Sequence, residues 1–165
     1  TPGALGVSVF QAFSRGKVRF ASPDPDDDPL VEANMLSDPR DVQRMWDALR
    51  RGAEIVRHPA IARIARSVTF GSSGLSLDEV FAMSEDERDR LILLEAGDAQ
   101  HAAGTCRMTP RTETSGVVNP DGSVKGVQRL RVADASIMPL DCRANTHFTS
   151  VMIGELVAAH MKRAA

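Results

Sequence analysis

The chain has 165 residues, enough for a domain with a buried core, and its 42% hydrophobic and 25% charged content is typical of a globular protein. Its formal net charge of −2 argues against nucleic acid or an anionic membrane as a partner. The apolar stretches are too short to span a bilayer, and no signal peptide is visible. We therefore expect a cytoplasmic protein without membrane insertion, whose N-terminus is processed or truncated.

Cysteines and acidic residues give no sign of a metal site. The two cysteines, Cys106 and Cys142, have neither the number for a disulfide framework nor a metal-ligand spacing. An acidic run at residues 23–29 alternates aspartates with prolines, which is more typical of a solvated turn than of a cation site. We expect no metal.

The N-terminal part begins with strand signals. Residues 6–22 alternate apolar and polar positions around Ser14-Arg15-Gly16, which predicts a hairpin with a short turn. Residues 30–36 predict a further short strand.

Helices follow. Ser37 is the expected N-cap of a helix with apolar spacing over residues 42–56, and a shorter helix is expected over residues 60–68. Ser84 and Glu87 form a predicted capping box for a helix that ends near residue 96.

The C-terminal part mixes turns with one strand and one helix. Asn119-Pro-Asp-Gly122 predicts a turn, residues 130–134 predict a strand, and residues 149–162 predict a helix with an apolar face. The order of elements indicates an α+β fold.

Of the four histidines, His101 is the strongest candidate for chemistry. His58 precedes a proline at a helix end and His160 lies in the last helix, so both are interpreted as surface or capping residues. His101 enters a Gly-Thr-Cys segment whose backbone can approach a planar ligand closely. No dinucleotide-binding Gly-x-Gly-x-x-Gly occurs anywhere in the chain.

Three motifs in order carry a family resemblance. They are His101-Ala-Ala-Gly-Thr-Cys-Arg-Met108, Asp134-Ala-Ser-Ile-Met-Pro139 and Asn145-Thr-His147. With them the chain resembles the glucose–methanol–choline (GMC) flavin oxidoreductases, over essentially its whole length. The resemblance implies an α+β fold in two parts. Residues 1–100 would form a substrate-domain segment, an antiparallel sheet with flanking helices. Residues 101–165 would carry the active-site histidine and complete the FAD-binding domain with its last strand and helix.

The resemblance also implies a function: FAD-dependent oxidation of a small-molecule alcohol. His101 would accept the hydroxyl proton while the carbinol hydride passes to flavin N5, and Asn145 would hold the substrate oxygen. For FAD, Asp134 and Ala135 would lie near the diphosphate and ribityl region, with Thr146 and the His147 backbone N–H at the isoalloxazine. A strand-end cap is the alternative role of Asp134.

The FAD-binding N-terminal portion is expected from the same gene or from a separate subunit. Two other functions stay open at this point: a hydroxynitrile lyase of the same fold, and a non-catalytic partner subunit of a split complex. His147 and Phe148 replace the family's commoner Asn and Ala or Pro. These changes could alter substrate specificity, and His147 could share the role of base.

Overall fold

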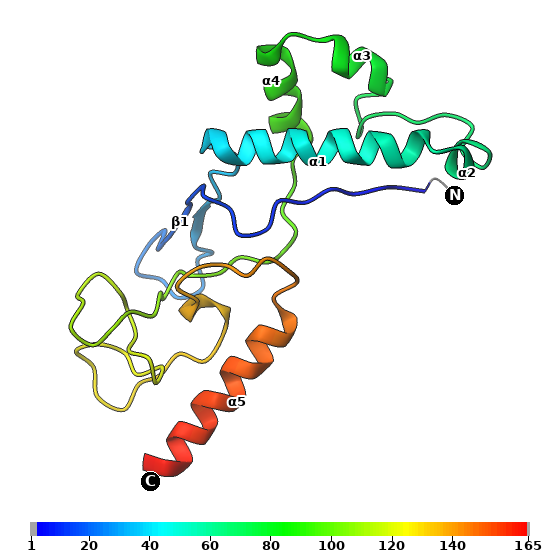
Figure 1. Ribbon diagram of the computed structural model, residues 1–165. Helices are drawn as coiled ribbons and strands as arrows, with labels where there is room; N and C mark the ends of the chain where they lie inside the picture. Colours follow the sequence, from blue (N-terminus) through cyan, green and yellow to red (C-terminus); the bar gives the residue numbers. More distant parts are fainter. Residues whose placement is uncertain (1–2, 165) are drawn as a thin grey trace. The chain divides into compact units, whose positions relative to one another are not determined.

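The computed structural model describes residues 3–164, and the chain divides into two compact units, Thr1–Ala99 and Gln100–Ala165 (Figure 1). The N-terminal unit contains β1 (Lys17–Arg19), β2 (Leu30–Glu32), α1 (Pro39–Arg57), α2 (Pro59–Ala62), α3 (Leu77–Ala82) and α4 (Glu85–Glu95). The C-terminal unit contains the 3₁₀ helix η1 (Ala135–Ile137) and α5 (His147–Ala164). Helices beside a small antiparallel sheet confirm the α+β class. That the parts belong to a substrate domain and a flavin domain stays a prediction.

The hairpin predicted within residues 6–22 is wrong. β1 pairs antiparallel with β2, with Val18 opposite Val31, so the acidic loop lies between the two strands. A Cβ at Gly16 would overlap the carbonyl oxygens of β2's last residue and of Ala33. Glycine there allows the chain to pass close to the end of β2. The strand predicted over residues 30–36 is shorter than expected.

A buried carboxylate, Asp41, explains why the residues before Gly16 do not form a strand. Its Oδ2 accepts hydrogen bonds from the N–H groups of Phe13 (2.8 Å) and Ser14 (2.7 Å) and from the Ser14 hydroxyl (2.7 Å). Arg44, one turn along α1, pairs with Asp41 at 3.0 Å. Burial would raise the pKa of Asp41, but the bonds from Ser14, Phe13 and Arg44 outweigh it and lower that pKa. The N-terminal segment is therefore held by side chains of α1.

Capping residues set the helix boundaries of this unit. The N-cap of α1 is Asp38, not the predicted Ser37, because the Asp38 carboxylate accepts from the Arg40 N–H at 3.0 Å. The capping box of Ser84 and Glu87 is confirmed at the start of α4. An equivalent box at Ser76 begins α3, a helix that was not predicted.

The second helix is much shorter than predicted. α2 ends at Ala62, while the prediction extended to residue 68. The interpretation of His58 as a capping residue is confirmed, since its Nδ1 accepts from the Ala60 N–H at 3.3 Å. The core of the unit forms where α1, α3 and α4 contribute buried side chains: Trp46, Val80 and Ile92.

The C-terminal unit is mostly loops packed against α5. The predicted turn is confirmed by the Gly122 N–H, which donates to the Asn119 carbonyl at 2.9 Å. The strand predicted over residues 130–134 is wrong: this segment makes only an isolated bridge, between Ser123 and Arg131. Two backbone hydrogen bonds flank the bridge, from the Val124 N–H to the Leu130 carbonyl and from the Val132 N–H to the Gly122 carbonyl (both 3.0 Å), and this pairing is too short to form a strand.

α5 begins two residues earlier than predicted and is apolar on two faces. Ile153 and Val157 face inward, in a core with Val118. Phe148 and Leu156 lie outward, 83% and 51% exposed. Among the described residues, no helix combines the length and the apolarity that crossing a membrane requires.

Candidate active site

The histidine segment is held beside η1 by backbone hydrogen bonds. The N–H of Gly104 donates to the Ala135 carbonyl (3.2 Å), and that of Cys106 donates to the Ser136 carbonyl (2.8 Å). Gly104 has φ +81°, and a Cβ there would lie 3.2 Å from the Met138 carbonyl oxygen. This ladder joins the first and second motifs, which are about thirty residues apart in the sequence.

His101 and Asn145 contact each other directly, although 44 residues separate them. The Nδ2 atom of Asn145 lies 3.0 Å from Nε2 of His101. The other end of the amide, Oδ1, accepts from the backbone N–H of His147 at 2.9 Å. Because Oδ1 is used in that way, the amide directs an N–H donor at the imidazole, and Nε2 is the accepting nitrogen. The structure thus brings together both residues predicted to be catalytic.

The opposite nitrogen of the imidazole has two oxygen neighbours. The carbonyl of Gln100 lies 3.0 Å from Nδ1, and the hydroxyl of Thr146 lies 3.2 Å from it. A neutral imidazole carries one N–H, and since Nε2 accepts, that N–H is on Nδ1. Gln100 and the Thr146 hydroxyl were not expected at the imidazole. A backbone carbonyl leaves no signal in a sequence, and Thr146 had been placed at the cofactor.

The side chain of His147 contacts its neighbour in α5. Its ring packs edge-on against Phe148, with 5.4 Å between the ring centroids, and both side chains are exposed. Its backbone N–H, predicted to face the flavin, is the donor to Asn145 described above. His147 therefore orients the amide, and its contact with a flavin stays a prediction.

Asp134 and Ala135 lie beside the histidine segment. The Asp134 carboxylate accepts from the Ser136 N–H at 2.8 Å and so caps η1. The alternative prediction for this residue was also a cap, but at the end of a strand and not at a 3₁₀ helix. Its side chain is exposed. The Ala135 carbonyl is occupied by Gly104. The predicted contacts of both residues with FAD are not tested by this geometry.

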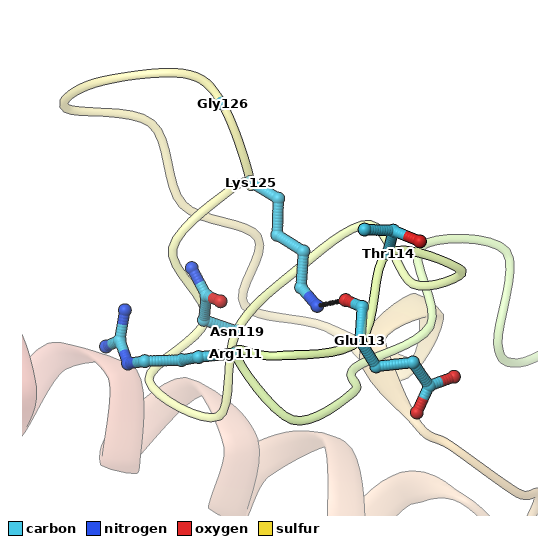
Figure 2. Close-up of a pocket in the computed structure, with 6 residues that line it drawn as sticks. All are labelled: Arg111, Glu113, Thr114, Asn119, Lys125 and Gly126. Carbon is cyan, nitrogen blue, oxygen red and sulfur yellow. Dashed lines mark hydrogen bonds between the residues drawn. The ribbon is translucent and has the colours of Figure 1, made fainter.

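A hollow elsewhere in the C-terminal unit contains none of the predicted site residues. Figure 2 shows the six residues that line it: Arg111, Glu113, Thr114, Asn119, Lys125 and Gly126. The Lys125 ammonium donates to the Thr109 hydroxyl (2.7 Å), to the Pro110 carbonyl (2.8 Å) and to the Glu113 carbonyl. Three acceptors use its three protons, and Arg111 is paired with Asp121 at 2.9 Å. The cations of this hollow brace loops and are not directed at a ligand.

No group of three or more potential metal ligands gathers within the described residues. The imidazole of His101, the amide of Asn145 and the hydroxyl of Thr146 form the polar cluster that contains both residues predicted to be catalytic.

Comparison with known proteins agrees with the motifs. The model of the GMC oxidoreductase C-terminal domain matches residues 12–154. The chain is 34% identical to an oxygen-dependent choline dehydrogenase of Cronobacter sakazakii, over 94% of this chain and 26% of that protein. It is 38% identical to an alcohol dehydrogenase [acceptor] of Pseudomonas putida, over 88% of this chain and 25% of that protein. The crystal structure of pyridoxine 4-oxidase from Mesorbium loti is similar, with a TM-score of 0.81 at 26% identity, over 93% of this chain and 28% of that one. The chain thus spans about a quarter of the length of these proteins.

Proposed function

Because this chain belongs to the GMC oxidoreductase family, we propose that it supplies the catalytic base of an FAD-dependent enzyme that oxidises an alcohol. The observation that carries the proposal is the contact of His101 Nε2 with Asn145 Nδ2, in which the imidazole nitrogen is an acceptor. The names of both sequence relatives, a choline dehydrogenase and an alcohol dehydrogenase, support an alcohol as the substrate class.

The residues around His101 fit the redox end of FAD, the cofactor of this family. Asn145 and His147 are exposed and His101 is half-buried, so their polar atoms are accessible to a bound ring system. The N-terminus of α5, an 18-residue helix, favours negative charge nearby, as on a reduced flavin. We expect the cofactor to be held at Asp134, Ala135, Thr146 and His147. The pyrophosphate end has no counterpart here, since the sequence contains no Gly-x-Gly-x-x-Gly.

Two side chains of this chain divide the work on the substrate hydroxyl. Nε2 of His101 accepts the hydroxyl proton, and the Asn145 amide donates to the oxygen as negative charge develops on it. The two groups lie 3.0 Å apart and bond to each other, so an alcohol oxygen that replaces this mutual hydrogen bond meets an acceptor and a donor at once. When bound, FAD supplies the acceptor for the hydride from the carbinol carbon. The product is a carbonyl compound, and the hydroxyl proton remains on His101.

We also propose that an N-terminal FAD-binding portion covers part of this chain. The relatives are about four times as long as the part they share with it. The outer face of α5 is apolar and exposed, notably at Phe148 and Leu156, so α5 has apolar side chains on a second face besides the one that packs in the core, which is typical of a helix covered on both faces. The strands of the small sheet are likewise exposed, with Val31 at 66%. We expect visible flavin absorbance when the chain is joined to that portion, and none when it is expressed alone.

Replacement of His101 tests the catalytic proposal. In the flavin-loaded protein, His101→Ala is expected to lower kcat for alcohol oxidation by about 10²–10⁴-fold, the usual contribution of a general base. Flavin content, measured by absorbance, should stay unchanged. The matched control is His58→Ala, which removes a histidine that caps α2 and should retain normal kcat. Full activity of His101→Ala would overturn the proposal and favour a non-catalytic role for the chain.

A further inference from the structure

The amide of Asn145 determines which nitrogen of His101 carries the proton. Its Oδ1 is occupied by the His147 N–H at 2.9 Å, so its Nδ2 must face Nε2. An imidazole with an accepting Nε2 has its N–H on Nδ1. That tautomer is the one a base needs, because Nε2 then carries a lone pair, which here accepts from the Asn145 amide and which a substrate hydroxyl can use instead.

Thr146 supplies a fixed hydroxyl on the Nδ1 side. Its Oγ1 lies 3.2 Å from Nδ1, and the residue is 8% exposed, so water has little access to this contact. Its backbone is fastened to α5, since its carbonyl accepts from both the N–H and the hydroxyl of Ser150 at 2.9 Å. The position of the Thr146 hydroxyl is therefore set by the first turn of α5.

The backbone carbonyl of Gln100 is the second oxygen on that side, 3.0 Å from Nδ1. Gln100 has φ +59°, in the left-handed region that is unfavourable for a non-glycine residue. A carbonyl can only accept a hydrogen bond. It therefore favours the same tautomer as the amide of Asn145 does from the other side of the ring.

We propose that Thr146 is a positioning residue of the active site: its hydroxyl, together with the Gln100 carbonyl, holds the proton of His101 on Nδ1 and so keeps Nε2 as the base. The role of His101 in this statement rests on the proposed function. The contact acts through the imidazole and requires no contact of the Thr146 side chain with substrate. When His101 has taken up the substrate proton, both oxygens remain acceptors for the Nδ1–H of the cation.

The test compares two substitutions in the flavin-loaded protein. Thr146→Val keeps the shape of the side chain but removes the oxygen, and we expect kcat to fall about five- to tenfold, the value of one hydrogen bond, with KM changed less than about twofold. Thr146→Ser keeps the hydroxyl and should stay within about twofold of the wild-type kcat. Thr149→Val is a control on α5, three residues after Thr146, and it should leave kcat unchanged.

A measurement that does not depend on turnover completes the test. In protein labelled with ¹⁵N-histidine, the side-chain nitrogen shifts of His101 should report an N–H on Nδ1 in the wild type and in Thr146→Ser. In Thr146→Val, or in Thr146→Ala if the valine variant does not fold, the signal of the Nε2–H tautomer should grow.

The outcomes separate this inference from the proposed function. An unchanged tautomer signal and an unchanged kcat in Thr146→Val would overturn the inference. An equal loss of kcat in Thr146→Ser and in Thr146→Val would also overturn it, because it would indicate that Thr146 has a packing role. Full activity of His101→Ala would instead overturn the proposed function, while the nitrogen shifts would still decide whether Thr146 holds the tautomer.

Discussion

The two units of this chain are organised by different kinds of contact. In the N-terminal unit, each of the longer helices begins at a side chain that caps it, such as Asp38 or Ser84, and the caps act over two or three residues. In the C-terminal unit, loops are held by backbone hydrogen bonds between distant segments, as from Gly104 to Ala135. The candidate active site lies in the C-terminal unit, among these loops. Precise placement of His101 therefore depends on contacts that span 30 to 45 residues.

The N-terminal unit also contains long-range bonds, and among them the loss of the buried Asp41 carboxylate should have the largest effect. Asp41→Ala leaves the N–H groups of Phe13 and Ser14 and the Arg44 guanidinium without their acceptor, at a cost of about 3 kcal/mol in the free energy of unfolding. Denaturant titration measures that loss, and hydrogen exchange should show it first at residues 10–14.

Asp47 offers a matched control on the same helix. It pairs with Arg50 at 2.8 Å, with the same three-residue spacing as Asp41 and Arg44, but its side chain is 57% exposed. Asp47→Ala should cost about 0.5 kcal/mol or less. Equal losses in the two variants would mean that the N-terminal segment is not anchored by the buried carboxylate.

The core of the C-terminal unit should show the next largest effect. Val118 is fully buried among Ile137, Ile153 and Val157, and Val118→Ala should cost about 2 kcal/mol, from two buried methyl groups and the cavity that they leave. Val127→Ala, at a position 50% exposed, should cost about 0.5 kcal/mol or less.

Hydrogen exchange in the Val118→Ala protein would sharpen the comparison of the units. We expect protection to fall in residues 100–164 and to change little in α1 and α4. A fall of the same size in both units would show that they unfold together, and that the division between them has no thermodynamic counterpart.

Low pH is expected to have a smaller effect on the free energy of unfolding, through the carboxylate of Asp121. In the folded protein the Ser123 hydroxyl lowers the pKa of Asp121 most; burial acts against it, and the Ser123 N–H, Arg111 and Arg131 lower it further. A carboxyl whose pKa is lower in the folded than in the unfolded state stabilises the fold fully above the unfolded pKa of about 4, and that stabilisation is lost as the pH falls below it.

The pH dependence of unfolding measures this contribution. The wild type should lose stability below about pH 4, and Asp121→Asn should lose less over the same range, because the titrating group is gone. The effect should be smaller than that of Val118→Ala, since Asp121 and its arginine partners are partly exposed. Parallel curves for the two proteins would show that Asp121 does not contribute to acid lability.

The two longer helices of the N-terminal unit, α1 and α4, were predictable. The spacing of apolar residues in α1 and the capping box of α4 are local signals, and both elements formed where expected. The hairpin predicted over residues 6–22 failed for a non-local reason: residues 11–14 found hydrogen-bond partners on Asp41 and Arg44, and β1 paired with β2 beyond the acidic loop. Alternation indicates an extended chain but does not identify what the chain pairs with.

The order of three motifs along the sequence was sufficient to identify the family and to select His101 and Asn145, because residue types and their order are written in the chain. The tertiary structure alone decided that the two side chains meet, that the Asn145 amide points its N–H at Nε2, and that a carbonyl and a hydroxyl lie at Nδ1. The physical reason is that the direction of a hydrogen bond depends on where loops 44 residues apart are held, and here that is set by the ladder beside η1 and by the first turn of α5.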